Sequence, residues 1–434
     1  MCGMLLSAVL VVWHNSALTK FGHIFSILIL IGFLQKTELR FIWYALLLAF
    51  ISFMEGPAKL FRQIFSGKIT SGRSGEVLRW LKLTLIPLLL GFIFFVIYYT
   101  ANARFAALCD RVWESFDFTF ELDWDIGRII FFLTGLIFFS ALIFTSDYTQ
   151  WFNKLPVQLL RKRQKNVFRL SNSPIALKNE YRTGLITIGL LNGLLFIVNM
   201  IDLRYIWIEY EDTTPQMLSQ YVHEGTYLLI LAILLAMLVL LYFFRNNLNF
   251  YPENDHLKQL AYLWIIQNCL LALSVGMRNY HYIHEYGLAY KRLGVIWFLI
   301  LTFSGLLSLY QKIEGKKTLF YLFHVNGWVF YASLILFSLI NWDIAITRYN
   351  LKGNTKNKID TWFLLHEMSD KNLYLILENR DLLHTKGVYR GDIDLALLQK
   401  QESFKKKLKK RDWRSWNWAD ERNKFYLTKE ELVE

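Results

Sequence analysis

The feature that most constrains this chain is a series of long apolar runs separated by short polar links. Most runs approach the roughly 20 residues that an α-helix needs to cross the hydrocarbon core of a bilayer. Alternating barrel-strand patterning is absent, so helices must satisfy the backbone hydrogen bonds in lipid. The runs are Met4–Trp13, Phe21–Leu34, Leu39–Met54, Leu83–Thr100, Ile129–Ser146, Thr183–Ile201, Tyr227–Phe244, Leu260–Gly276, Leu293–Tyr310 and Leu319–Ile340. We therefore predict an all-α, polytopic transmembrane helix bundle of about ten spans, with a range of about eight to ten.

Composition and charge favour a membrane protein over a soluble one. Hydrophobic residues make up 54% of the 434 residues. The net charge of +13 is compatible with nucleic-acid binding. However, many basic residues lie in short links between apolar runs, where they orient the spans. We expect no nucleic-acid partner. The cysteines Cys2, Cys109 and Cys269 lie far apart and lack metal-ligand spacing, so we predict no disulfide framework.

The charges of the links predict the orientation in the membrane. The link 151–182 contains many Lys and Arg residues, with Glu180 as its acidic residue. The links 101–127 and 204–226 are acidic. Because basic loops remain in the cytoplasm, we expect the basic links inside and the acidic links outside. If each later run crosses once, the C-terminal region is extracytoplasmic, although one miscounted span would reverse that side. These features predict a multi-pass membrane protein with its basic loops on the cytoplasmic side.

The chain is predicted to have two domains. Residues 1–341 form the helix bundle, with interfacial helices near 103–116 and 152–170, where apolar residues recur at helical spacing among charges. Residues 342–434 change composition abruptly and form a soluble, mostly helical C-terminal region. That region includes an expected helix over 392–410, followed by the aromatic stretch Trp413–Trp418. Membrane lipid is the expected partner of the basic and aromatic segments, and the C-terminal region can also engage a protein partner.

One candidate functional cluster lies near the later links. It consists of Arg278, His281, His284, Glu285, Arg292, Asp343 and Arg348. On a helix, the spacing of His281, His284 and Glu285 places two imidazoles and a carboxylate on one face, as in a partial metal site. No further ligand can be nominated, so we predict no metal and no cofactor. Interfacial anchoring by His and Tyr is the preferred interpretation of this segment, and fixing helix ends is the preferred interpretation of the Arg and Asp residues.

Polar residues within the apolar runs form a second candidate set. Its members are Asn192, Asn199, Asp202 and Asn268. Ionisable groups at membrane depth usually indicate function. Amides also serve as interhelical hydrogen bonds worth about 1 kcal/mol each. For this set, packing is the preferred interpretation and a solute pathway is the alternative.

Four stretches together resemble a known family. They are Ala101–Phe105 with Asp123-Trp124 and Gly127-Arg128; His223–Tyr227; the link with Arg278, Tyr282, Tyr286–Leu288 and Arg292; and Asn341, Asp343 and Arg348–Leu351. The chain resembles, from about Leu83 to the C-terminal region, the bacterial integral-membrane proteins grouped as a domain of unknown function of the 4153/4173 type. The last two stretches, in that order and separated by two apolar runs, are its most specific part. The resemblance implies a polytopic membrane protein with a helical C-terminal region, and it brings no reaction, ligand or catalytic residue.

Three function classes remain open. The preferred one is a non-catalytic membrane scaffold or sensor, because the C-terminal region is substantial and no acid–base or metal set converges. The second is a transporter of a small or lipidic solute that uses the intramembrane amides, Asp202 and Arg278. The third is an enzyme on a lipid-linked substrate that uses Arg278, His281, His284, Glu285 and Arg348. No catalytic residue is assigned.

Overall fold

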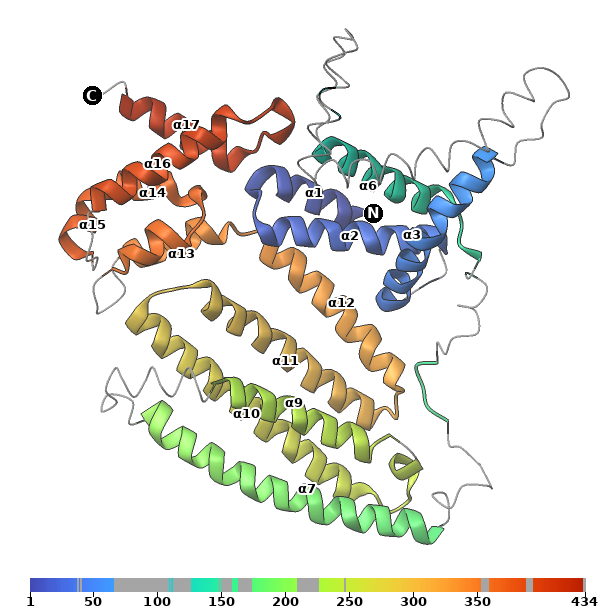
Figure 1. The fold of residues 1–434 in the computed structure, drawn as a ribbon. Helices are drawn as coiled ribbons and strands as arrows, with labels where there is room; N and C mark the ends of the chain where they lie inside the picture. The colour runs from blue at the N-terminus through green and yellow to red at the C-terminus, as the bar shows by residue number, and fades with distance from the viewer. Residues whose placement is uncertain are drawn as a thin grey trace, which may run out of the picture. The chain divides into compact units, whose positions relative to one another are not determined.

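The structure is a computed structural model, and it is almost entirely helical wherever it describes the chain (Figure 1). It describes residues 1–36, 39, 41–65, 109, 111, 126–147, 149, 158–162, 174–208, 226–245, 247–352, 359–387 and 393–431. Within these ranges no strand element forms, and the extended pairings are isolated bridges. The predicted all-α fold is therefore confirmed. The predicted span Leu83–Thr100 lies outside the described residues, as do nearly all of the interfacial helix near 103–116 and most of the segment 152–170.

The apolar part of the chain forms long helices joined by short links. They are α1 (Cys2–His14), α2 (Ala17–Gln35), α3 (Ile42–Phe65), α6 (Ile126–Ile143), α7 (Pro174–Asp202) with its π-helical extension η3 (Leu203–Ile208), α9 (Thr226–Phe243), the short η6 (Asn247–Phe250), α10 (Asp255–Tyr286), α11 (Tyr290–Glu314) and α12 (Leu319–Ser338). Shorter helices follow. They are α13 (Trp342–Leu351), η7 (Phe363–Glu367), η8 (Asp370–Asn372), α14 (Leu373–Glu378), α15 (Arg380–Lys386), α16 (Ile393–Lys409), η9 (Trp413–Ser415) and α17 (Trp418–Glu431).

Five helical stretches among the described residues are long and apolar enough to cross a bilayer. They are Ala17–Gln35, Leu177–Ile208, Asp255–Tyr286, Tyr290–Glu314 and Leu319–Ser338. Three further apolar helices, Cys2–His14, Ile130–Ile143 and Leu228–Phe243, are shorter. The chain is thus a membrane protein by the length and composition of its helices, and five candidate spans are found where about ten were predicted.

By contacts, the chain divides into two compact units. The second unit contains Leu28–Leu39 and Tyr44–Lys154. Inside it, α2 meets α3 at very close range, because a Cβ added at Gly32 would lie only 2.0 Å from the carbonyl oxygen of Ala45. The amide of Gln35 then donates to the carbonyl of Ala141 at 2.6 Å, which ties α2 to α6. Small residues at the crossing and an amide bond across it are typical of helix packing in lipid.

The first unit contains Met1–Ile27, Arg40–Trp43 and Leu155–Glu434. In it, α7 and α10 lie side by side and run in the same direction. The amide of Asn192 donates to the Leu260 carbonyl, and that of Asn199 donates to the Gln267 carbonyl, with the same offset of 68 residues. An offset that stays constant along two helices requires a parallel pair.

The other helices of this unit complete an alternating pattern. Lys312 of α11 donates to the Phe244 carbonyl at the end of α9, again with an offset of 68 residues, and Gly305 lies beside Met237, so α9 and α11 are also parallel. Helices α11 and α12 pair in opposite directions, because Trp297 bonds to Ser333 near one end and Gln311 to Tyr321 near the other. The C-terminal ends of α7, α10 and α12 therefore share one end of the bundle, which we call the tail end.

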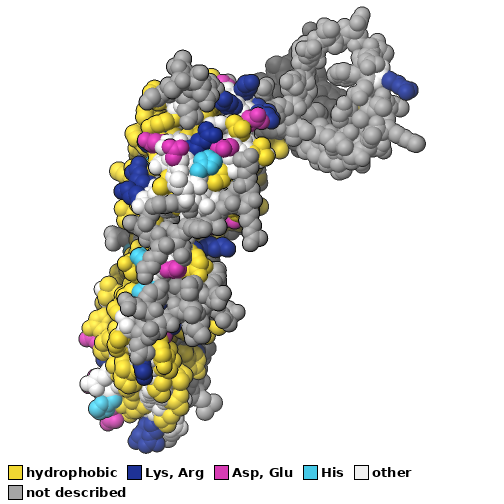
Figure 2. All heavy atoms as spheres, turned by 90° about the vertical axis from the view of Figure 1, so that its left-hand side faces the viewer, with side chains coloured by type: hydrophobic (Ala, Val, Ile, Leu, Met, Phe, Trp, Pro, Cys, Tyr) yellow, Lys and Arg dark blue, Asp and Glu magenta, His cyan; other side chains and the backbone are white. Residues whose placement is uncertain are grey.

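The helices after α12 have a core of their own at the tail end. Buried side chains from α13 to α16 pack around Tyr374, and Leu293 at the start of α11 joins the same cluster. A smaller cluster contains Leu373, Phe404 and Leu427. Figure 2 shows the resulting contrast on one face: hydrophobic side chains dominate its lower part, whereas basic and acidic side chains are mixed in its upper part. The part of the chain after α12 thus combines a buried core with a polar exterior.

A buried lysine organises part of this C-terminal core. The ammonium of Lys400 on α16 donates to the carbonyls of Leu364, Leu365 and Met368, at 3.1, 3.1 and 3.0 Å. These carbonyls belong to or follow the π-helical turn η7, whose last carbonyls lack partners within the helix. Burial lowers the pKa of Lys400 to about 8. Lys400 thus satisfies three carbonyls at this helix end, together with Asn372, which also donates to the Leu364 carbonyl.

Candidate functional site

The intramembrane amides predicted from the sequence form a ladder between α7 and α10. Besides the two bonds that set the register, Gln267 donates to the side-chain oxygen of Asn192 at 3.0 Å. Asn268 instead donates to the carbonyl of Trp264 within its own helix, at 2.7 Å. All four side chains are buried. Asn192, Asn199 and Gln267 join the two parallel helices, while the side-chain oxygens of Asn199 and Gln267 have no hydrogen-bond partner among the described residues.

A buried ion pair extends this ladder toward the tail end. The guanidinium of Arg278 on α10 donates to the carboxylate of Asp202 at the end of α7. The second carboxylate oxygen of Asp202 and the Nε of Arg278 have no hydrogen-bond partner among the described residues. Breaking such a pair by removing one partner is costly, because it leaves a charge in an apolar environment. The pair joins the C-terminal end of α7 to α10 within the last third of that helix.

The histidines of α10 do not assemble a metal site within the described part of the chain. His281 lies 3.2 Å from the carbonyl of Ile206, so it ties α10 to η3. The ring of His284 lies beside that of Tyr280. No group of three His, Cys, Asp or Glu side chains in the described ranges is placed to hold a metal ion. His281, His284 and Glu285 share a helix face, as their spacing predicts, and the described residues around them supply no further ligand.

The turn between α10 and α11 joins the two most specific sequence stretches. Asn350 of α13 accepts a hydrogen bond from the Leu288 amide at 2.7 Å and donates to the Leu288 carbonyl at 3.0 Å. Arg292 donates to the carbonyl of Gly287 and lies 4.4 Å above the ring of Tyr282. Through Asn350, the α13 stretch therefore holds the α10–α11 turn.

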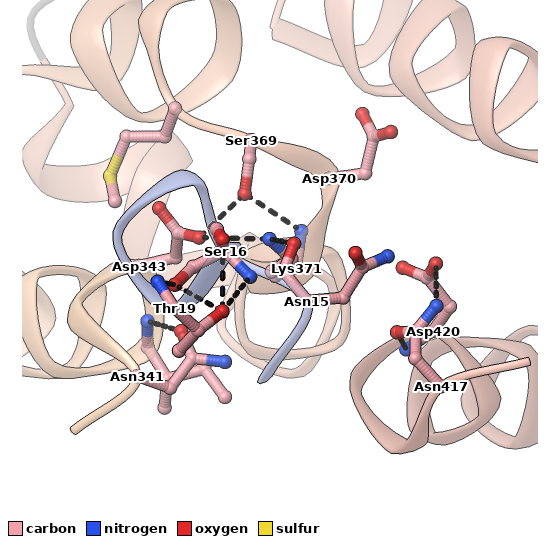
Figure 3. Close-up of polar contacts among 12 residues, drawn as sticks. Asn15, Ser16, Thr19, Asn341, Asp343, Ser369, Asp370, Lys371, Asn417 and Asp420 are labelled. Carbon is pink, nitrogen blue, oxygen red and sulfur yellow. Dashed lines mark hydrogen bonds and ion pairs between the residues drawn. The ribbon is translucent and has the colours of Figure 1, made fainter. Parts of the chain in front are cut away.

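Asp343 belongs to a polar junction of its own, which we define as Asn15, Asp343, Ser369 and Lys371 (Figure 3). Ser369 donates to the Asp343 carboxylate at 2.7 Å. The ammonium of Lys371 lies 3.9 Å from that carboxylate and donates to the Asn15 carbonyl at 2.6 Å. Burial lowers the pKa of Lys371, and Asp343 opposes part of that shift. The junction connects the α1–α2 turn, α13 and η8.

A cavity of about 350 Å³ opens beside the polar junction. Ser16, Asp343, Ser369 and Lys371 form its polar wall, and the remaining lining residues are mainly apolar and aromatic, Trp297, Phe337 and Trp342 among them. The cavity lies at the tail end of the bundle, where Asp343 and Lys371 border the ends of the apolar helices α11 and α12. The cavity therefore offers a buried ion pair and aromatic rings to whatever occupies it.

The structure divides the cluster that the sequence placed together. Arg278 and Asp202 are one buried pair, Arg292 belongs to the α10–α11 turn, and Asp343 belongs to the polar junction. Arg348 lies on the exposed side of α13. Sequence reasoning missed Lys371 altogether. The available signal was the polar stretch Ser369–Asn372 between the apolar residues Met368 and Leu373, since four polar residues inside a core sequence indicate specific partners.

Comparisons with known proteins give one match. A family model described as "Domain of unknown function (DUF4153)" matches residues 1–379. No curated protein and no solved structure matches the chain. The matched range contains the apolar helices, the α10–α11 turn and every member of the polar junction.

Proposed function

This chain belongs to the DUF4153 family, and from that premise we propose that it is a non-catalytic membrane scaffold or sensor whose C-terminal helices engage a partner. The observation that carries the proposal is the polar junction. Through Lys371 it ties η8 both to the α1–α2 turn and to Asp343 of α13. Because the C-terminal helices are held to the bundle by this junction, a conformational change in the bundle can reach them, and binding of a partner to them can affect the bundle.

The pairing of the candidate residues also supports a structural role for the bundle. The amides Asn192 and Asn199, and the pair Asp202–Arg278, bond across one helix interface. A transporter would need such groups to face a pathway, and a lipid-linked enzyme would need Arg278 and Arg348 to converge. Both alternatives are therefore less well supported than the scaffold or sensor.

The proposed topology is about ten spans in the cytoplasmic membrane of a bacterium, with the basic links inside and the C-terminal region outside. The alternating directions of α7, α9, α10, α11 and α12 support it, because the basic link precedes α7 and the C-terminal helices follow α12 at the tail end. The exposed Trp413, Trp416 and Trp418, together with Trp13 beside Trp418, suit a headgroup layer at that end.

Photo-crosslinking in native membranes tests the proposed engagement of a partner. A photoreactive phenylalanine at Trp413, which is 79% exposed, is expected to give a discrete protein adduct. The matched control carries the same group at Leu142 of α6, an exposed apolar position outside the C-terminal region. Lipid adducts alone at Trp413, or the same protein adducts at both positions, would contradict the scaffold or sensor.

The coupling through the polar junction has a separate test. Lys371→Met leaves the Asp343 carboxylate buried without its cation, and breaking a buried pair costs about 3–5 kcal/mol. Hydrogen exchange of full-length protein in nanodiscs should show faster exchange in α13 and α14. The double variant Lys371→Met with Asp343→Asn removes both charges and should recover part of the protection. Unchanged exchange in the single variant would show that the junction does not hold these helices.

A further inference from the structure

A second cavity lies at the end of the bundle opposite the tail end, and it is the larger of the two described here. Its volume is about 740 Å³. Its walls come from the C-terminal ends of α9 and α11, the N-terminal end of α12 and the segment 158–162. None of the residues used by the polar junction or by the Arg278–Asp202 pair lines it.

The segment 158–162 is a fixed wall of this cavity. Leu160 forms an antiparallel bridge with Lys317 in the α11–α12 turn. The amide of Arg161 donates to the Lys316 carbonyl at 3.0 Å, and the amide of Thr318 donates to the Leu159 carbonyl at 2.9 Å. These bonds hold the segment against the turn, so its side chains enter the cavity from a defined position.

The charged residues described in the lining of the cavity are all basic. Among the described lining residues, Arg161, Lys162, Arg245 and Lys312 are cations and none is Asp or Glu, while Glu180 outside the lining interacts with Arg245. Lys312 is only 2% exposed. Its ammonium and the guanidinium of Arg161 both donate to the same acceptor, the Phe244 carbonyl, at 3.3 Å each. Within the described ranges neither cation forms an ion pair, and one neutral carbonyl cannot balance two charges in an apolar environment. Among the described residues, no anion pairs with Arg161 or Lys312.

The remaining walls are apolar and continue along the outside of the bundle. Leu238 and Tyr242 of α9, and Leu319 and Phe323 of α12, line the cavity and are also partly open on the surface. Leu231 and Leu235 extend the exposed apolar face of α9 away from the cations. A molecule that fits this surface has a negatively charged head and hydrocarbon chains.

We propose that this cavity binds the phosphate group of an anionic membrane phospholipid, with its acyl chains along the apolar faces of α9 and α12. Arg161 and Lys312 contact the phosphate, and Lys162 and Arg245 surround it, since cations bind phosphate through charge-assisted hydrogen bonds. This end of the bundle adjoins the basic link, as expected for the anionic cytoplasmic leaflet. The proposal does not depend on the role of the C-terminal helices.

The test uses full-length protein in nanodiscs of phosphatidylcholine, with and without phosphatidylglycerol, followed by native mass spectrometry. The wild type is expected to retain phosphatidylglycerol. Arg161→Gln with Lys162→Gln should lower that retention about thirtyfold, since each of the two cations near the surface contributes about 1 kcal/mol. The matched control is Lys178→Gln with Arg182→Gln, two exposed cations at the same end that do not line the cavity. Equal losses in the two double variants would reduce the effect to general surface charge and overturn the site.

Two further arms separate lipid binding from anion binding. Leu238→Trp fills the apolar wall and keeps every cation, so it should lower phosphatidylglycerol retention as well. Inorganic phosphate, added to protein in phosphatidylcholine alone, is expected to raise the thermal transition less than phosphatidylglycerol does. Equal stabilisation by inorganic phosphate, together with full lipid retention by Leu238→Trp, would overturn the assignment of a lipid.

Discussion

Arg278 and Arg348 show how burial separates two arginines that the sequence placed in one candidate cluster. Arg278 is buried and pairs with Asp202 inside the bundle, whereas Arg348 lies on the exposed side of α13. Their surroundings differ in dielectric and in partners, and these two properties decide what a charge contributes. At this scale, residue type alone says little about role.

These two arginines give a matched pair of variants. Arg278→Ala leaves Asp202 buried without a cation and is expected to destabilise the protein by about 3–5 kcal/mol. Arg348→Ala removes an exposed side chain that interacts with the hydroxyl of the buried Tyr374, so it should cost less than Arg278→Ala, about 1 kcal/mol. Abundance in the membrane and the thermal transition in detergent measure both. If Arg348→Ala lost as much stability as Arg278→Ala, the exposed fraction of the side chain would not explain the effect of these substitutions.

Lys400 predicts a pH dependence of the C-terminal core. Burial lowers its pKa to about 8, below its ordinary value of 10.5. Between these values the unfolded state binds more protons than the folded state, so stability should rise as pH increases through this window. The difference between wild type and Lys400→Met isolates the effect, which should amount to a few kcal/mol, about 3 at most. Hydrogen exchange of α16 amides at pH values across the window measures it. A difference that falls with rising pH would contradict the buried ammonium.

At the scale of elements, the helices follow from local pattern and their ends follow from specific contacts. The expected helix over 392–410 is confirmed as α16. The turn between α10 and α11 needs more than pattern. Gly287 has a φ of +80°, a conformation that side chains rarely adopt, and its position faces Asn350. Two features require glycine at this position. One is the positive φ of the turn, and the other is the close approach of the Asn350 side chain from α13.

Gly287→Ala tests both requirements of this turn. The added Cβ would lie 2.6 Å from the side-chain oxygen of Asn350, in addition to the strain at positive φ. We expect a loss of stability of about 1–3 kcal/mol. Asn350→Ala alone removes the clamp on Leu288, and the combined variant should cost less than the sum of the two because the steric conflict is gone. Thermal unfolding of the three variants measures this coupling. Simple additivity would indicate that backbone strain alone matters.

At the scale of the whole molecule, the directions of the helices decide which segments share a side of the membrane. Because α7 and α10 are parallel and α11 and α12 are antiparallel, the α10–α11 turn and the C-terminal helices share the tail end. The α11–α12 turn lies at the other end. The relative positions of these later segments do not depend on the number of spans before α7.

Cysteine labelling in intact cells tests this arrangement. In a background without Cys2, Cys109 and Cys269, single cysteines at Lys291 and Trp413 are expected to react with an impermeant reagent from outside. Cysteines at Lys316 and Lys178 should react only after the membrane is opened. Labelling of Lys291 and Lys316 from the same side would contradict the alternation of α10, α11 and α12.

The sequence by itself determined the class of this protein, the helical fold and the positions of its later apolar helices. It could do so because the length of an apolar run and the hydrogen bonding of a helix are local properties. It predicted about ten spans, whereas five described helices meet the length and hydropathy required. Only the tertiary structure paired Asp202 with Arg278 and brought Lys371 to Asn15, 356 residues away. Such contacts depend on which helix faces meet, and no local pattern contains that information.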